Sequence, residues 1–360
     1  MPKKTRREYI DAVQCLMNKP PIYPKSEVPG ARSHFDDFSA THISQAPFVH
    51  FDVSVFSLLF HYHISSSNPL TFHQGVFFHF HRYYLWLYEQ ALRTECGYKG
   101  TQPYWDWTID YANPAQSPVF DGSSTSMGSD GSPAHVGIVN ISAFGLTVPI
   151  NPGAGGGCIA KGPFKNHTIN LGPVASEPRD SDGGLGYNPR CLTRDLHPEW
   201  TNHTKPTDIV DAFTACGDDL GCLDTNAEGA IGFHTSGHFA VGGIMMDPWA
   251  SPQDPVFFLH HAQVDRLWSV WQGLDPGKRI QHVYGTQTAF NRESCSLSIL
   301  YCYQNLPFQN KHMLIYVTDS EPPSANVTLE SELDYGRLAG KQRVKDVVST
   351  VDGPFCYAYI

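Results

Sequence analysis

Two sets of histidines, far apart in the sequence, have the residue type and the number needed to hold metal ions. They belong to a total of eighteen histidines in a chain of 360 residues. The candidate ligands are His42, His50 and His81 in the first set, and His234, His238 and His261 in the second. Neutral imidazole is a good ligand for copper. Neither set includes a cysteine or a carboxylate ligand, and this absence favours copper over zinc or magnesium. The pattern predicts a six-histidine pocket for two copper ions.

Such a pocket indicates oxidation chemistry. Two metals about 3.5 to 4 Å apart can act together on one small molecule. Three neutral histidines per copper leave an open coordination position, as catalytic metal sites require. Copper changes its oxidation state, so a phenol or a catechol is a suitable reductant for dioxygen at such a site. We therefore expect a small phenolic substrate and dioxygen as the partners of the chain.

Two longer patterns contain these histidines. One joins His50 and His81 to Arg82-Tyr83-Tyr84-Leu85, and the other runs from Asp254-Pro255 through Phe257-Phe258 and His261 to Asp265. Both resemble the copper signatures of the tyrosinase, catechol oxidase and hemocyanin group, and they occur in the same order. The similarity to the short tyrosinase-like enzymes of filamentous fungi extends from Arg7-Glu8-Tyr9-Ile10 to the C-terminal Tyr357-Ala358-Tyr359.

The resemblance implies a fold, a cofactor and a reaction. The fold would be mainly α, one tyrosinase-like domain over residues 1–360 in which a four-helix bundle surrounds the copper pair between long irregular loops. The first histidine set would hold one copper (Cu A) and the second set the other (Cu B). The implied enzyme is a polyphenol oxidase that converts o-diphenols to o-quinones, with weak monophenol hydroxylation. A hemocyanin-like oxygen carrier would use the same ligands, but a single domain without a covering domain favours the enzyme.

Helical spacing explains how His81 is positioned. Apolar residues recur with it at intervals of three and four, as on the buried face of a helix: Phe77, His81, Leu85, Tyr88 and Leu92. Gly97 follows and predicts the end of this helix. Arg82 then lies on the flank of the same helix.

The second set of histidines also follows helical spacing. Asp254 can cap a helix with Pro255 in its first turn, and Gly273 would end it. His261 then faces inward, and His260 is turned away by about 100 degrees. His234 and His238 are four residues apart, so they share one face of a short helix that ends at Gly242-Gly243. We interpret His260, together with His79, His135 and His282, as surface or supporting residues.

A long segment separates the two histidine sets. Residues 110–189 are rich in Gly, Ser, Pro and Asn and show little periodicity. The segment predicts an irregular surface region.

Several residues beside the ligands are candidates for catalysis. Glu228 can hold a water that accepts the phenolic proton. Thr235 follows His234 where good monophenol hydroxylases of the family often have Asn, and Phe239 follows His238. Because a hydroxyl orients a base water less well than an amide does, Thr235 favours diphenol oxidation. An ion pair between Asp265 and Arg82 would join the two metal-bearing helices.

Phe48 stands two residues before His50, where many relatives have a cysteine that is bonded to this histidine. The thioether crosslink of those relatives is therefore not expected in this chain.

Residues 53–74 interrupt the first copper signature. His50 and His81 are 31 positions apart, and removal of the 22 residues Val53–Gln74 would leave the nine positions that the signature has. Val53-Ser54, Leu70-Thr71 and Gln74 can be encoded by splice donor, branch-point and acceptor sequences. We hypothesise a retained intron. If the segment is a genuine insertion, His73 can replace His50 as a ligand, or the Cu A site is broken and the chain inactive.

A second segment, at about residues 292–321, has a similar character. The family would pass almost directly from Asn291 to Pro322, and the segment contains Cys295 and Cys302. Arg292-Glu293-Ser294 can be encoded around a splice donor sequence, so a retained intron is the hypothesis here too, and a genuine loop insertion is the alternative for both segments.

Composition indicates a secreted protein. The formal net charge of −10 argues against nucleic acid or an anionic membrane as a partner. Nine cysteines without a Cys-x-x-Cys pair favour scattered disulfides over a zinc site. Four glycosylation sequons, at Asn140, Asn166, Asn202 and Asn326, agree with an oxidising secretory route. The basic start lacks an apolar core, so either the protein is intracellular or its natural start, with a signal peptide, is missing. The resemblance implies a missing start, because further residues that include a cysteine precede this helix in the fungal family.

Overall fold

The fold is described from a computed structural model, which covers residues 1–50, 74–134, 136–143, 146–176, 182–229, 231–287 and 325–360. The longer helices are α1 (Lys3–Leu16), α2 (His34–Val49), α4 (Phe77–Cys96), α7 (Pro206–Cys216), α8 (Leu220–Glu228), α9 (Phe233–Val241) and α10 (Val256–Leu274). Short helices are α5 (Trp107–Asp110), η1 (Pro114–Gln116), α6 (Pro198–Thr201), η2 (Gly243–Met246), η3 (Ser251–Gln253), α11 (Pro276–Arg279) and η5 (Val344–Asp346). The prediction of a mainly α fold is confirmed.

Strands are few and short in the described residues. They form four antiparallel pairs: β1 (Gly131–Pro133) with β4 (Gly156–Ile159), β2 (Val139–Ala143) with β3 (Leu146–Ile150), β5 (Thr168–Ile169) with β6 (Arg190–Cys191), and β7 (Glu332–Leu333) with β8 (Gln342–Arg343). Residues 110–189 are therefore less irregular than their composition predicts. In the β2–β3 pair Val139 lies opposite Ile150 and Ala143 opposite Leu146.

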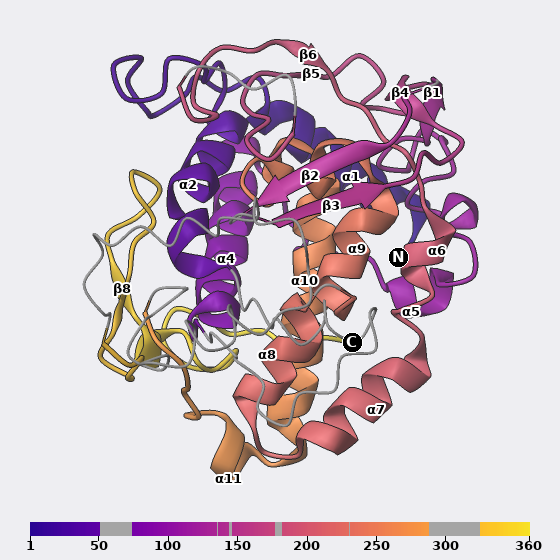
Figure 1. Ribbon diagram of the computed structural model, residues 1–360. Helices are drawn as coiled ribbons and strands as arrows, with labels where there is room; N and C mark the ends of the chain where they lie inside the picture. Colours follow the sequence, from indigo (N-terminus) through magenta and orange to yellow (C-terminus); the bar gives the residue numbers. More distant parts are fainter. Residues whose placement is uncertain (51–73, 135, 144–145, 177–181, 230, 288–324) are drawn as a thin grey trace, which may run out of the picture.

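Helices α2, α4, α9 and α10 form the centre of the molecule (Figure 1). Their packing is aromatic: Phe38 of α2 contacts Tyr84 and Tyr88 of α4 edge to face, and Tyr88 stacks on Phe258 of α10. Large buried rings of this kind contribute much of the apolar area that stabilises a core. The predicted four-helix bundle is confirmed.

Local sequence explains where these helices begin and end. Ser33 and Asp36 form a capping box at the start of α2, with each side chain bonded to the other residue's backbone N–H. Gly97 ends α4 with a φ of 68°, which glycine adopts without strain. α10 begins one residue after Pro255, and the Asp254 carboxylate accepts the N–H of Val256. The predicted ends of α4 and α10 agree with the structure to within about two residues.

Three disulfides connect the described elements. They are Cys15–Cys96, Cys158–Cys191 and Cys216–Cys222, and Cys356 is exposed and free. The first links α1 to the end of α4, and the second links the β4 and β6 segments. The prediction of scattered disulfides is confirmed.

Three segments meet where the described chain is interrupted. Gln74 pairs with Thr286, and Thr286 pairs with Asn326. The Gln74 side chain donates to the carbonyl of Val49. Residues 53–73 and the segment 292–321, which the sequence marks as insertions, lie outside the described residues, and so do His73, Cys295 and Cys302.

Candidate metal centre

The first histidine set converges between α2 and α4. His42 lies inside α2, His50 caps its C-terminus, and His81 lies in the second turn of α4. The Nε2 atom of His42 is 3.0 Å from that of His50 and 3.4 Å from that of His81. All three side chains are buried. This group is the predicted Cu A site, and the structure places His50 in it.

The second set converges between α9 and α10. His234 and His238 are one turn apart on α9, and His261 lies in the second turn of α10. The Nε2 atom of His238 is 3.0 Å from that of His234 and 3.1 Å from that of His261. This buried group is the predicted Cu B site.

The two groups face each other across the bundle. The His81 and His261 rings are stacked with centroids 4.2 Å apart, and those of His50 and His234 are stacked at 5.7 Å. The Phe77 ring lies 4.7 Å from His81 and 4.6 Å from His234. The six imidazoles therefore form one compact centre with an apolar wall.

Hydrogen bonds at the outer nitrogens fix the orientation of four rings. Each Nδ1–H donates to an acceptor behind the ring: His42 to the Trp249 carbonyl at 2.7 Å, His50 to Glu228 Oε1 at 3.0 Å, His81 to the Phe77 carbonyl at 2.8 Å, and His238 to the Met245 carbonyl at 2.8 Å. A proton on Nδ1 of a neutral ring leaves a lone pair on Nε2. These partners orient ligands as the supporting groups of metal sites do.

Electrostatics keep the rings neutral. Burial lowers the pKa of His50 and His238 to about 3, and it lowers the pKa of the other four well below the usual 6.5. Neighbouring imidazoles lower the pKa further for five of them. Neutral imidazole is the form that binds a metal.

The arrangement of the ring nitrogens fits a bound cation and would be unfavourable without one. His42 and His50 point Nε2 lone pairs at each other over 3.0 Å, and neither ring has a proton there to share. Two lone pairs at this distance repel unless a positive charge lies between them. The first group offers three nitrogen donors, and the second offers four because His260 lies beside the predicted ligands. Neither group contains a sulfur or a carboxylate, and such a donor set suits copper.

Support for His42 comes from a carboxylate that the sequence did not single out. Asp247 accepts the backbone N–H groups of Trp249 and Ala250 through one oxygen and those of Val174 and Ala175 through the other. It thereby fixes the turn that presents the Trp249 carbonyl to His42. No sequence signal marks Trp249, Met245 and Phe77 as acceptors, because a backbone carbonyl accepts a hydrogen bond regardless of the side chain of its residue.

The ion pair predicted between the metal-bearing helices is confirmed. Arg82 Nε of α4 donates to Asp265 Oδ1 of α10 at 2.7 Å, and both side chains are buried. The other Asp265 oxygen accepts the hydroxyls of Tyr357 and Tyr359 at 2.7 and 2.6 Å. The C-terminal tyrosine motif is thus anchored directly behind the centre.

Glu228, Thr235 and Phe239 lie on or beside α8 and α9. The Glu228 side chain is only 4 % exposed, so its carboxylate is shielded from solvent. The Thr235 hydroxyl donates to the Glu228 carbonyl at 3.0 Å. Phe239 packs edge-on against Trp200, in an apolar cluster with Ile141 and Ile150 of the β2–β3 hairpin.

Surface or supporting positions were expected for four other histidines, and the structure describes three of them. His79 and His260 are buried, with exposures of 1 % and 0 %. His260 accepts a hydrogen bond from Trp107 and stacks on His234, so its supporting position is confirmed and a surface position is wrong. It faces inward because α5 covers this side of α10. His282 is partly exposed, and His135 lies outside the described residues.

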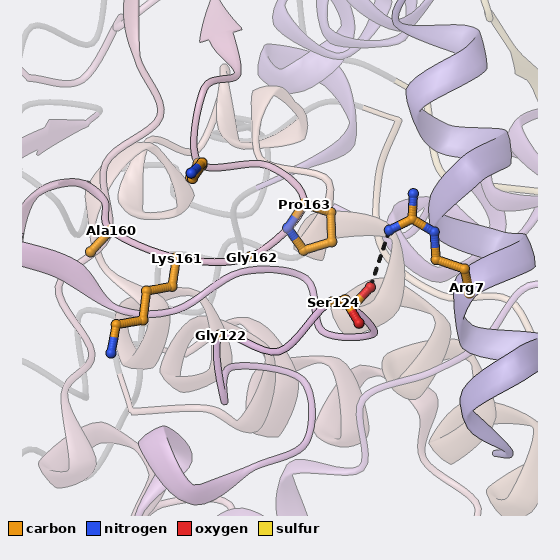
Figure 2. A pocket seen from close by; sticks show the side chains of 8 residues that line it. Arg7, Gly122, Ser124, Ala160, Lys161, Gly162 and Pro163 are labelled. Carbon is orange, nitrogen blue, oxygen red and sulfur yellow. Dashed lines mark hydrogen bonds between the residues drawn. The ribbon is translucent and has the colours of Figure 1, made fainter.

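A surface hollow lies elsewhere on the molecule. It measures about 380 Å³ and lies beside α1, lined by Arg7, Lys161 and Lys165 with Gly122, Ser124, Ala160, Gly162 and Pro163 (Figure 2). Arg7 donates to the Ser124 carbonyl there. No histidine of either group lines this hollow, so it is separate from the metal centre.

Comparison with known sequences agrees with this geometry. A sequence model described as the common central domain of tyrosinase matches residues 32–274, which include all six histidines. The chain belongs to the tyrosinase family. As a member of it, the chain is a copper oxidase with a two-copper centre.

Individual relatives show the extent of the similarity. Tyrosinase P of Aspergillus terreus is 35 % identical over 99 % of this chain and 89 % of its own. N-acetyl-6-hydroxytryptophan oxidase ivoB of Emericella nidulans is 32 % identical over 98 % of this chain and 87 % of its own. The solved structure of a mutant polyphenol oxidase from Thermothelomyces thermophila matches with a TM-score of 0.79 and 34 % identity, covering 100 % of this chain and 86 % of its own.

Proposed function

We propose that this tyrosinase-family oxidase converts o-diphenols to o-quinones and hydroxylates monophenols weakly. Two o-diphenols each lose two electrons and two protons, and one dioxygen accepts all four electrons and four protons to give two waters. The copper pair supplies the electron transfer when it is bound. His42, His50 and His81 would hold Cu A, and His234, His238 and His261 would hold Cu B.

The preference for diphenols depends on position 235, where the threonine offers no donor to a water beside the metal centre. The proton of the Thr235 hydroxyl is donated to the Glu228 carbonyl at the end of α8. Because its proton is used in this bond to the last residue of α8, the hydroxyl is a poor donor for a water beside His234. A monophenol requires removal of its proton by a positioned base before it is hydroxylated, and such a base contributes about 10²–10⁴-fold to a rate.

For Glu228 the geometry supports a positioning role. Its Oε1 accepts the His50 Nδ1–H, so the carboxylate acts on Cu A through this ring. Because Glu228 lies on α8, beside the Cu B helices, it ties a Cu A ligand to the other half of the centre. The water-holding role that the sequence suggested for Glu228 stays a prediction beside this one. Phe239 supports α9 by packing, and we assign it no contact with the substrate.

The experiment compares catechol with phenol on the copper-loaded protein. We expect catechol oxidation to exceed phenol hydroxylation by about 100-fold or more. Thr235→Asn should raise the ratio of phenol to catechol turnover, because an amide can donate to a water. Thr235→Val is the matched control without a hydroxyl and should leave the ratio low. Comparable wild-type rates on both substrates would overturn the proposal.

Secretion is a second part of the proposal. Three disulfides agree with folding in an oxidising compartment, and all four sequon asparagines are exposed. None of the described helices is long and apolar enough to cross a membrane. Protein recovered from the medium of a fungal host should lose mass on treatment with an endoglycosidase. Recovery only from the cell interior, with reduced thiols and no glycan, would contradict this.

A further inference from the structure

A fourth histidine lies against the Cu B group. Donor nitrogens of His234, His238, His260 and His261 lie within 4.8 Å of one another. The His260 ring stacks on His234 with centroids 5.4 Å apart and contacts His238 at 4.5 Å. A copper with four imidazoles would lose the open position that catalysis requires. The structure must therefore keep one of the four off the metal.

The indole of Trp107 determines which nitrogen of His260 carries a proton. Trp107 Nε1 is 3.0 Å from His260 Nδ1, and both residues are fully buried. An indole N–H can only donate, so His260 Nδ1 must accept and cannot carry a proton. A charged ring would have a proton on Nδ1 as well, so the geometry requires the neutral ring. Its single proton is then on Nε2.

With this tautomer neither nitrogen can bind copper. The Nδ1 lone pair is taken by the indole, and Nε2 carries the proton. We propose that Trp107 is a positioning residue that keeps His260 out of the Cu B shell and leaves three histidines on that copper. The inference rests on the Cu B ligand set proposed above. It adds a reason why three histidines, and not four, bind this copper.

The surrounding backbone holds both partners in place. A Cβ on Gly237, between His234 and His238, would lie 2.3 Å from His260 Cε1, so the ring packs directly on the α9 backbone. The segment before Trp107 is tied to α10, because the N–H of Trp105 donates to the carbonyl of Leu259 at 3.0 Å. The Asp106 carboxylate accepts from Gln263 of the same helix. Trp107 and His260 therefore cannot separate without displacing α5 from α10.

The first test reads the tautomer without any metal. Two-bond proton–nitrogen NMR of the metal-free chain, labelled with ¹⁵N-histidine, reports which nitrogen is protonated, and His260→Gln identifies the signal. We expect the Nε2–H form in the wild type and a detectable Nδ1–H form in Trp107→Phe. An Nδ1–H form in the wild type would overturn the proposal.

The second test counts ligands on a lone copper. In a His81→Ala background, which disables Cu A, pulsed EPR of bound Cu(II) should detect three imidazoles. Adding Trp107→Phe should give four, and adding His260→Leu as well should return three. Trp105→Phe is the matched control, since its indole donates to Asp110 instead of a histidine. Four imidazoles with Trp107 present, or three in Trp107→Phe, would refute the role of Trp107.

The outcomes separate this inference from the ligand set on which it rests. If the His81→Ala chain binds no copper, the proposed Cu B ligands are wrong, and the NMR result still decides the tautomer. In the full two-copper protein, Trp107→Phe should lower catechol turnover by about 10- to 100-fold, the usual effect of removing a supporting contact at a metal site.

Discussion

At the scale of the residue, the metal centre depends on groups behind the histidines as much as on the histidines. Four of the six rings donate a proton to a fixed acceptor, and three of these acceptors are backbone carbonyls. Only Glu228 is a side chain that mutation can remove cleanly. It provides a direct test of how orientation contributes to copper binding.

Glu228→Ala should weaken Cu A binding by about 10- to 100-fold, because the His50 ring loses the acceptor that fixes its tautomer. Glu228→Gln keeps an acceptor oxygen and should retain most of the affinity. Competitive titration with a copper chelator measures both affinities, and Cu B serves as an internal reference. Equal loss at both coppers, or none at either, would contradict a specific role through His50.

The histidines themselves were predictable from the sequence, whereas their supports were not. His81 and His261 belong to long patterns, and helical spacing gave His234 and His238 a common face. The burial of His260 could not be predicted in this way. Helical spacing shows that His260 faces a different direction from His261, but not whether another element covers it. What covers it is Trp107, which is 153 residues away in the sequence. Long-range packing of this kind leaves no local signal.

At the scale of the element, α4 and α10 are joined by a buried charge pair. Arg82 reaches Asp265, Gln272, Ser269 and the Val348 carbonyl, and its guanidinium lies over the Trp268 ring. Removal of one partner of a buried pair leaves an uncompensated charge in the core. The pair thus controls how the two metal-bearing helices dock.

Asp265→Asn should lower the free energy of unfolding by about 3–5 kcal/mol. The control is Glu332→Gln, whose exposed pair with Lys341 should be worth less than about 1 kcal/mol. Urea unfolding of the metal-free variants measures both. If the two changes cost the same, the Arg82–Asp265 pair does not organise the bundle.

Both ends of the second suspected insertion and the C-terminal end of the first lie at one small ladder. Gly75 N–H donates to the Thr286 carbonyl, Val327 to Gly285, and Gln287 to Ala325. Gln287 lies beside Ala325, and the Gln74 side chain donates to the Val49 carbonyl, so the chain leaves and re-enters the described fold at neighbouring points in each case. This supports, as a proposal, the view that neither segment is required for the bundle.

Deletion of residues 53–74, with Asp52 joined to Gly75, should give a folded chain that still binds two coppers. His50→Ala in this shortened chain should bind one. Elemental analysis against protein concentration gives both numbers. A shortened chain with one copper would instead assign the missing ligand to the deleted segment, where His73 is the candidate.

The element boundaries were predicted better than the region between the histidine sets. Caps and glycines mark the ends of α4, α9 and α10, and each of these signals acts within one turn. The strands β1 to β5 contain two to five residues and are bounded by Gly, Pro and Ser, so no alternating pattern is long enough to reveal them. Their pairing depends on partners up to about 30 residues away, as in β1 with β4.

At the scale of the whole molecule, the core holds an unusual number of neutral histidines. Burial lowers the pKa of nine of them in the described residues: His42, His50, His79, His81, His167, His234, His238, His260 and His261. In the unfolded chain the same groups titrate near 6.5. Mild acid, at a pH just below 6.5, should therefore already lower the stability of the metal-free protein.

As pH falls below about 6.5, the unfolded chain takes up protons on these histidines before the folded chain does, so the free energy of unfolding decreases. Each group contributes at most about 1.4 kcal/mol per pH unit. The melting temperature of the metal-free protein should fall between pH 7.5 and 5.5, where carboxylates do not yet titrate. His79→Gln should reduce this slope, because burial lowers the pKa of His79 in the folded chain. A constant melting temperature over this range would contradict the burial of neutral rings.

The most direct measurement is the copper content of the purified chain and of one variant from each histidine group. The wild type should contain two coppers per chain, and His42→Ala and His238→Ala should contain one each and lose catechol turnover. One copper or fewer in the wild type, or two in either variant, would contradict a centre built from three histidines of each set.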